Sequence, residues 1–387
     1  MTPTPDRVVD LLSQLIAIPS VNPVFDPESP GEGAMASFIE QWARANYLDV
    51  EIQDVLPNRP NVIVRIVRDP ALPTLVFESH MDTVSIVEGT RGGFTPTIED
   101  GKVYGRGSCD TKGSMAAMMV AIENLAANPD DLACNVEFLA AVSEEVGGAG
   151  AETYARSNPA ASAAIVGEPT ELRIVYGHKG VLRGKIEVIG KAAHTSVADE
   201  GINAIDGMTD VILALRQMAS SLAGGLTSGS FTVSIIEGGT GINIVPARCV
   251  IQYDRRLVPG DTDESVRREI EAALDTVRAS RPDLRIELHE PALYVVPLDT
   301  PIDAPLVQVA RQAATTAGLN PEPTLVPYGS DASRLSGIAG IPCIVFGPGD
   351  IGNAHGADEY VPVEELHGAA TFYEAIARNF GKESSRS

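Results

Sequence analysis

Five acidic residues and two histidines occupy positions at which a folded protein seldom places charge, and most of them follow short apolar segments. They are His80, Asp82, Asp110, Glu144, Glu145, Glu168 and His355. The apolar segments are Thr74–Ser79, Val136–Ser143 and Ala163–Gly167, each typical of a buried β-strand. A carboxylate seldom ends such a strand unless a cation meets it there. Because strand C-termini line the ligand crevice of an open α/β sheet, this feature predicts both the sheet and a metal site at its edge.

The composition excludes several classes of partner. The net charge of −23 at pH 7 makes nucleic acid and anionic membranes poor partners, because both repel an acidic surface. No apolar stretch approaches the ~18 residues of a membrane span. The first residues lack a basic segment followed by an apolar one, so we expect a cytoplasmic protein. The four cysteines are scattered without a paired motif, which predicts reduced core residues.

The order of the expected elements predicts two domains, since 387 residues are too many for one ordinary core. Up to Glu168, strand-like and helix-like segments alternate, which predicts an α/β domain with a doubly wound, mostly parallel sheet. From Gly180 to His289 the order becomes strand-helix-strand-strand-helix-strand, which is the ferredoxin-like order of an α+β domain. The alternating pattern then returns. The expected limits are residues 1–176 and 291–387 for a catalytic domain, with residues 177–290 inserted as a ferredoxin-like dimerisation or lid domain.

The residue types at the strand ends match the ligands of a two-metal centre. Zinc takes histidine nitrogen and carboxylate oxygen, and a catalytic site keeps one position open. Two zinc ions some 3.5–4 Å apart can share a bridging carboxylate, which requires about five protein ligands. The candidates are His80, Asp110, Glu145, Glu168 and His355. Asp82 lies two residues after His80, so both side chains share one face of a strand, and Asp82 is expected to orient the His80 ring.

Glu144 and Glu145 are adjacent and therefore need different roles. Two consecutive ligands of one metal would force a sharp bend in the chain. A division into one ligand and one general base avoids this bend. The general base would take a proton from the metal-bound water as that water attacks a carbonyl.

Five motifs, in this order, resemble those of a known family. They are Ser79-His-Met-Asp-Thr83, Gly105-Arg-Gly-Ser-Cys-Asp110-Thr-Lys-Gly113, Ser143-Glu-Glu-Val-Gly-Gly148, Gly167-Glu-Pro-Thr170 and Ala354-His-Gly-Ala357. The sequence is similar to the co-catalytic di-zinc amidohydrolases, which include acetylornithine deacetylase, succinyl-diaminopimelate desuccinylase, aminoacylase and the glutamate carboxypeptidases. The resemblance covers nearly the whole chain, and the order of the motifs makes it specific.

The resemblance implies a role for each residue of the predicted centre. It assigns His80 and Glu168 to one zinc and Glu145 and His355 to the other. Asp110 would bridge the two ions, with a cis peptide bond to Thr111. The same resemblance implies that Asp82 supports His80 and that Glu144 is the general base.

The resemblance also implies roles in the inserted domain and a homodimer. His194 matches the histidine that reaches the active site of the partner subunit, where it would stabilise the oxyanion in trans. Asn243 and Gly329 match substrate-contacting positions. Arg256 matches the arginine that binds the substrate carboxylate, and the proline that follows favours it over Arg255.

These observations lead to one preferred function and two alternatives. The preferred function is a di-zinc hydrolase, in which a water bridging the metals attacks the amide of a small N-acyl amino acid. Co²⁺ or Mn²⁺ could replace Zn²⁺. A carboxypeptidase or dipeptidase would use the same machinery on a peptide bond. A metal-binding or scaffold protein that lost catalysis would have lost Glu144 or a ligand, and this sequence retains all of them.

Overall fold

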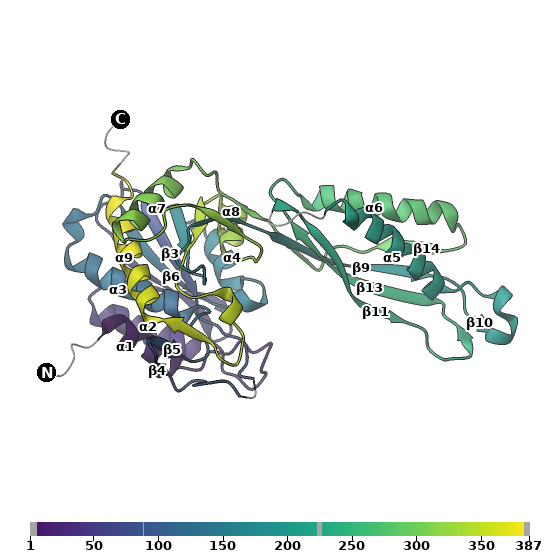
Figure 1. Ribbon diagram of the computed structural model, residues 1–387, viewed down its shortest axis with the longest axis horizontal. Helices are drawn as coiled ribbons and strands as arrows, with labels where there is room; N and C mark the ends of the chain where they lie inside the picture. The colour runs from purple at the N-terminus through teal and green to yellow at the C-terminus, as the bar shows by residue number, and fades with distance from the viewer. Residues whose placement is uncertain (1–5, 88, 223–226, 383–387) are drawn as a thin grey trace. The chain divides into compact units, whose positions relative to one another are not determined.

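A computed structural model describes residues 6–87, 89–222 and 227–382 of the chain. The chain divides into two compact units (Figure 1). The first unit contains residues 1–177, 300–325 and 330–387. The second unit contains residues 178–299 and 326–329, so it interrupts the first in sequence.

The first unit contains a mixed β-sheet with a parallel centre. Its strands are β1 (Asp49–Leu56), β2 (Arg59–Ile66), β3 (Thr74–His80), β6 (Asn135–Ala141), β7 (Ala161–Val166), β8 (Val175–His178) and β18 (Cys343–Val345). They lie in the order β1-β2-β6-β3-β7-β18-β8. Strands β6, β3, β7 and β18 are parallel to one another, whereas β1 pairs antiparallel with β2, β2 with β6, and β8 with β18. The expected α/β fold with a mostly parallel sheet is therefore confirmed.

Helices cover this sheet. They are α1 (Arg7–Ile16), α2 (Gly33–Ala45), α3 (Lys112–Ala127), α4 (Ala149–Arg156), α7 (Pro305–Thr316), α8 (Ala332–Ala339) and α9 (Val363–Asn379). Helices α1, α2, α3, α7 and α9 share one apolar core with the sheet, while α4 and α8 pack against each other. Helix α3 packs against α1, α9 and β3, which explains why it is apolar on most of its circumference. It begins two residues after Asp110.

A small sheet in the same unit joins two distant segments of the chain. Its order is β19-β5-β4, formed by β4 (Thr97–Glu99), β5 (Lys102–Tyr104) and β19 (Tyr360–Pro362). The pairing of β19 with β5 brings the segment before residue 360 beside the segment after residue 104.

Among the described residues, no helix is both long enough and apolar enough to cross a membrane.

The second unit has the ferredoxin-like order of elements. These are β9 (Gly180–Ile189), α5 (Ala204–Ser220), β11 (Ser230–Gly238), β13 (Arg248–Leu257), α6 (Asp263–Ser280) and β14 (Arg285–Leu288). The strands lie in the order β11-β13-β9-β14, all antiparallel, and both helices contribute to the core of this unit. A short pair is formed by β10 (Ala193–His194) and β12 (Ile244–Val245).

The second unit extends further along the chain than residue 290. Strand β15 (Leu293–Val295) pairs with β9, so the segment after β14 belongs to the sheet of this unit. The first unit resumes at Thr300. Two further short strands are β16 (Leu298–Asp299) and β17 (Thr324–Val326).

Asn61 offers a test of how β2 supports the sheet edge. Its buried side chain accepts a hydrogen bond from the Val142 N–H (3.1 Å) and donates to the carbonyl of Gly150 (2.9 Å). Replacing Asn61 with alanine leaves these buried groups without their partner, and each such group costs about 1–3 kcal/mol. We therefore expect Asn61→Ala to lower the midpoint of thermal unfolding. The exposed Asn124, which bonds only to Glu374 among the bonds described for its side chain, is the matched control, and Asn124→Ala should change the midpoint little. Equal midpoints for the two variants would contradict this account.

Candidate metal centre

Three neighbouring parallel strands carry four of the candidate residues to one edge of the sheet. His80 is the last residue of β3, and Glu168 follows β7 by two positions. Glu144 and Glu145 begin a short 3₁₀ turn (Glu144–Val146) after β6. Since β6, β3 and β7 are adjacent and parallel, their carboxyl ends lie together.

Two further candidates come from loops. Asp110 immediately precedes Thr111 and α3, and the Asp110–Thr111 peptide bond is cis, as the resemblance predicted. His355 lies in the loop before β19 and has a positive φ of 62°, a left-handed conformation that is uncommon for residues other than glycine. The chain thus brings together groups that are separated by more than two hundred residues.

Asp110 lies between the two histidines. Its Oδ1 is 3.0 Å from Nε2 of His80, and its Oδ2 is 3.2 Å from Nε2 of His355. Each carboxylate oxygen therefore faces a different imidazole. Nε2 of His355 also lies 3.1 Å from Oε1 of Glu145, and Nε2 of His80 lies 4.0 Å from Oε1 of Glu168. Asp110, Glu145 and Glu168 thus contact the two histidines in one connected cluster.

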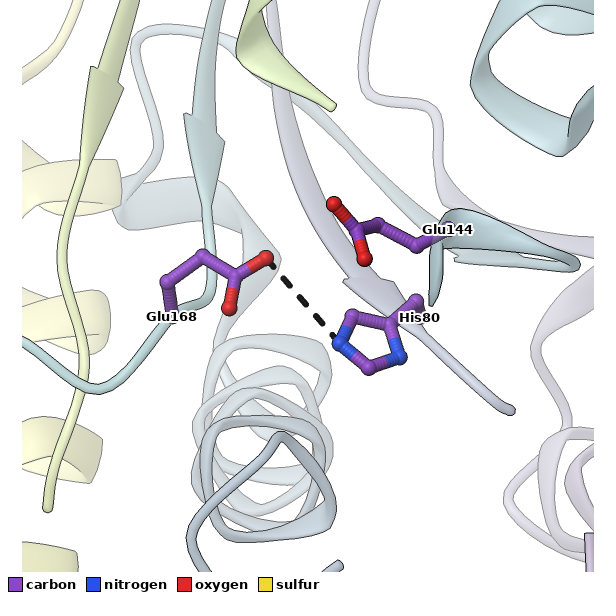
Figure 2. A group of neighbouring side chains, drawn as sticks. All are labelled: His80, Glu144 and Glu168. Carbon is purple, nitrogen blue, oxygen red and sulfur yellow. Dashed lines mark ion pairs between the residues drawn. The ribbon is translucent and has the colours of Figure 1, made fainter. Parts of the chain in front are cut away.

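The donor atoms form two groups, each compact enough to hold one ion. Oxygen and nitrogen atoms of His80, Glu144 and Glu168 lie within 4.8 Å of one another, as do those of Asp110, Glu145 and His355. Figure 2 shows the carboxylates of Glu144 and Glu168 near the His80 ring, each supplied by a different segment, with the ion pair between Glu168 and His80 drawn as a dashed line.

The protonation of the site reflects its excess of negative charge. Burial raises the pKa of the Glu168 carboxyl well above its ordinary value, and the charge of Asp110 raises it further. Burial also favours a raised pKa for Asp110, but hydrogen bonds with His355 and His80 lower that pKa below its ordinary value. Hydrogen bonds to Asp110 and Glu145 raise the pKa of His355 to about 10. The carboxylates around the His355 imidazole thus favour its protonated form when no cation is bound.

The donor set fits divalent cations. Imidazole and carboxylate are the ligands that zinc accepts, and cobalt and manganese also bind them. A bound cation would replace the protons on the two histidines as the source of positive charge. By their positions, His80, Glu144 and Glu168 could hold one such ion, and Asp110, Glu145 and His355 a second.

Asp82 contacts both the His80 ring and the turn that carries the two glutamates. Nδ1 of His80 is 3.0 Å from the backbone carbonyl of Asp82 and 3.5 Å from its Oδ1. The carboxylate also accepts the N–H groups of Glu144 (3.0 Å) and Glu145 (3.3 Å). Asn22 donates to the same carboxylate at 2.8 Å. The sequence analysis missed Asn22, since it lies sixty residues upstream in a segment without a recognisable motif.

The remaining candidate residues belong to the second unit, where His194 and Asn243 are neighbours. His194 pairs with Ile244 in the β10–β12 ladder, and the Thr195 N–H donates to the carbonyl of Asn243. Nδ1 of the exposed His194 ring accepts the Ser196 N–H at 3.1 Å. A neutral ring with Nδ1 as acceptor carries its proton on Nε2, which can then act as a donor.

The two adjacent arginines of β13 point in different directions. Arg255 is buried and lies near Asp261 and Glu269. Arg256 is partly exposed, and its Nε donates to Oδ1 of Asp254 at 2.8 Å. Arg256 is therefore the arginine whose guanidinium solutes can reach. Gly329 lies in the short segment that returns to the second unit.

Known proteins resemble this chain over most of its length. Residues 76–379 match the family described as Peptidase family M20/M25/M40. Acetylornithine deacetylase from Photorhabdus laumondii is 30% identical, over 91% of this chain and 92% of the relative. The same enzyme from Proteus mirabilis is 30% identical, over 93% of this chain and 95% of the relative.

Solved structures share the fold at lower identity. Aminopeptidase PepT from Bacillus cereus has a TM-score of 0.79 at 23% identity, covering 97% of this chain and 99% of that one. A dinuclear metal-binding peptidase of the M20 family from Bacillus subtilis has a TM-score of 0.74 at 18% identity, covering 96% of each chain. The chain therefore belongs to peptidase family M20/M25/M40 and is a metal-dependent enzyme that hydrolyses amide bonds.

Proposed function

We propose that the chain is a two-zinc hydrolase that removes the acyl group from a small N-acyl amino acid, as acetylornithine deacetylase does. The observation that supports it most is the position of Asp110, whose two oxygens face two separate histidines. His80 and Glu168 would hold one ion, and Glu145 and His355 the other. When bound, the ions supply Lewis acidity to the acyl carbonyl and lower the pKa of a water molecule.

Glu144 is the proposed general base. Its carboxylate lies beside His80 and Glu168, at the ends of strands that also carry proposed ligands (Figure 2). Burial raises the pKa of Glu144 well above its ordinary value, which suits a group that must take a proton and later release it. Glu144 would accept a proton from the attacking water and donate it to the leaving amine.

The choice of an N-acyl amino acid as substrate has two supports. The relatives at 30% identity are acetylornithine deacetylases, whereas the peptidases are similar at lower identity. The guanidinium of Arg256 is also accessible, and its planar fork suits the carboxylate of an amino acid. Asn243 and Gly329 would contact the same substrate.

The second unit has a surface suited to pairing with a second copy. Strand β11 lies at the edge of its sheet among the described strands, and Ile235 (46% exposed) and Ile236 (56%) lie on it. On α5, Leu213 is 56% exposed. Exposed edge strands with apolar side chains are sites of strand addition. In the proposed homodimer, His194 would donate from Nε2 to the developing oxyanion in the partner's site.

Replacing Glu144 should separate catalysis from metal binding. Glu144→Gln preserves the size of the side chain but cannot accept the proton, so we expect kcat to fall about a hundred- to ten-thousand-fold. Zinc content, measured by elemental analysis, should stay at the wild-type value. The matched variant Glu145→Gln should lose zinc. If Glu144→Gln also loses zinc, Glu144 is a ligand and not the base.

The substrate class can be tested with a panel that contains N-acetylornithine, N-succinyl-diaminopimelate, other N-acetyl amino acids and several dipeptides. Released amine is the readout for the zinc-loaded enzyme. We expect an N-acyl amino acid to have the highest kcat/KM. Amidation of its carboxylate should lower kcat/KM for the wild type much more than for Arg256→Met. Turnover of dipeptides alone would assign the chain to the peptidases of the family.

Action of His194 in trans can be tested by mixing two inactive variants. His194→Ala and Glu144→Gln should each have low activity as homodimers. A co-expressed mixed dimer contains one site with an intact Glu144 and the intact His194 of the other subunit, so activity should return. Absence of recovery in a mixed dimer verified by differential tags would show that His194 does not act across the interface.

A further inference from the structure

A buried ion pair adjoins the proposed metal ligands without being one of them. Nη1 of Arg106 lies 2.5 Å from Oε2 of Glu359, and both side chains are 1% exposed. Arg106 follows β5 closely and Glu359 immediately precedes β19, so the pairing of these two strands brings the residues together. Burying an ion pair so completely lowers the stability of the fold unless further hydrogen bonds satisfy the remaining donors and acceptors of the pair.

Glu359 meets this requirement through the backbone of the Asp110 loop. Its Oε1 accepts the N–H of Cys109 at 3.0 Å and the N–H of Asp110 at 3.1 Å. Its carboxylate therefore uses one oxygen for Arg106 and the other for the loop. These bonds fix the main chain from which the Asp110 side chain projects between the two histidines.

Arg106 holds the backbone of the His355 loop, although its own Nε has no hydrogen-bond partner within the described part of the chain. Its Nη2 donates to the carbonyls of His355 at 3.3 Å and Gly356 at 3.2 Å. His355 is left-handed, a conformation that persists in a non-glycine residue only where its surroundings determine it. Arg106 supplies two of the contacts that hold this loop.

We propose that Arg106 and Glu359 are positioning residues that keep the backbones of Asp110 and His355 in place, so that the two side chains face each other. Asp110 faces both histidines, whereas His355 belongs to one proposed ion only. The ion held by Glu145 and His355 would therefore depend on this pair more than the ion held by His80 and Glu168. This inference rests on the proposed two-metal site. It deepens that proposal by making the two ions unequal in their dependence on residues that touch neither.

A purely structural role for the pair predicts a different result. Arg106 and Glu359 would then only connect β5 and β19, and their replacement would lower the midpoint of unfolding without a selective effect on either metal. A positioning role predicts selective loss of affinity for one ion. Replacement of such supporting groups typically lowers metal affinity about 10- to 100-fold.

The experiment is a zinc titration of the full-length chain after removal of metal with a chelator. The variants are Arg106→Lys, which can still pair with Glu359 but lacks the fork that reaches His355, and Glu359→Gln, which keeps an acceptor oxygen without charge. The matched control is Arg65→Lys, which changes another ion pair of the first unit, that of Arg65 with Glu137 (2.6 Å). Calorimetry gives the affinity for each equivalent, and circular dichroism gives the unfolding midpoint.

For Arg106→Lys, which frees the His355 loop, we expect the first zinc to bind as in the wild type and the second to bind about 10- to 100-fold more weakly. For Glu359→Gln, which also frees the Asp110 loop, we expect the second zinc to be weakened more than the first. The control should bind both ions as the wild type does. Unchanged binding of both ions by folded Arg106→Lys and Glu359→Gln, or equal weakening of both, would overturn the inference and leave the two-metal proposal standing. A wild-type chain that binds fewer than two zinc ions would instead overturn the two-metal proposal itself.

Discussion

The repulsion among carboxylates gathered at one sheet edge is the constraint on which the rest of the site depends. Asp110, Glu145 and Glu168 lie close together and are largely withdrawn from water. Two like charges 4 Å apart repel by about 4 kcal/mol at an effective dielectric constant of 20. Such a cluster of carboxylates is stable only where nearby positive charge offsets the repulsion. The raised pKa values of His80 and His355 show that the carboxylates favour the positively charged form of each imidazole. Because the carboxylates favour nearby positive charge, this edge of the sheet is also suited to binding divalent cations.

The apolar core brings the strands together, but buried polar contacts set the positions of the loops. Ser143, which precedes the two glutamates, is left-handed, and its N–H donates to the buried carboxylate of Glu32 at 3.0 Å. Glu32 in turn pairs with Arg59. The His355 loop shows the same plan, with a left-handed residue held through a buried arginine. A left-handed residue other than glycine persists only where its surroundings determine its conformation, and at both loops buried hydrogen bonds contribute to this.

The sequence predicted what depends on local pattern and missed what depends on tertiary contact. The apolar segments that end in charge predicted the sheet and pointed to five of the candidate residues, His80, Asp82, Glu144, Glu145 and Glu168. Asp110 and His355 were added by their residue type and by the resemblance, and the structure brings all seven close together. Nothing local distinguishes Asn22 or Glu359, because each acquires its role from a partner more than fifty residues away. The inserted domain was expected to end at residue 290, whereas this segment of the second unit ends at Asp299, for a related reason. The short β15 is assigned to the second unit by its pairing with β9, a contact that composition does not reveal.

The contact between Asp254 and Arg256 bears on how one metal site can serve enzymes with different substrates. Hydrolysis of an N-acyl amino acid and hydrolysis of a peptide both require attack of water on an amide carbonyl. Selectivity between these substrates must therefore come from groups that contact other parts of the substrate. Asp254 accepts a hydrogen bond from Nε of Arg256 and so restricts the orientation of the guanidinium. A partly exposed pair of this kind adds little stability by itself. If Arg256 binds the substrate carboxylate as proposed, the pair would act through the entropy of binding, because a guanidinium that is already oriented loses less freedom when its remaining N–H groups meet a carboxylate.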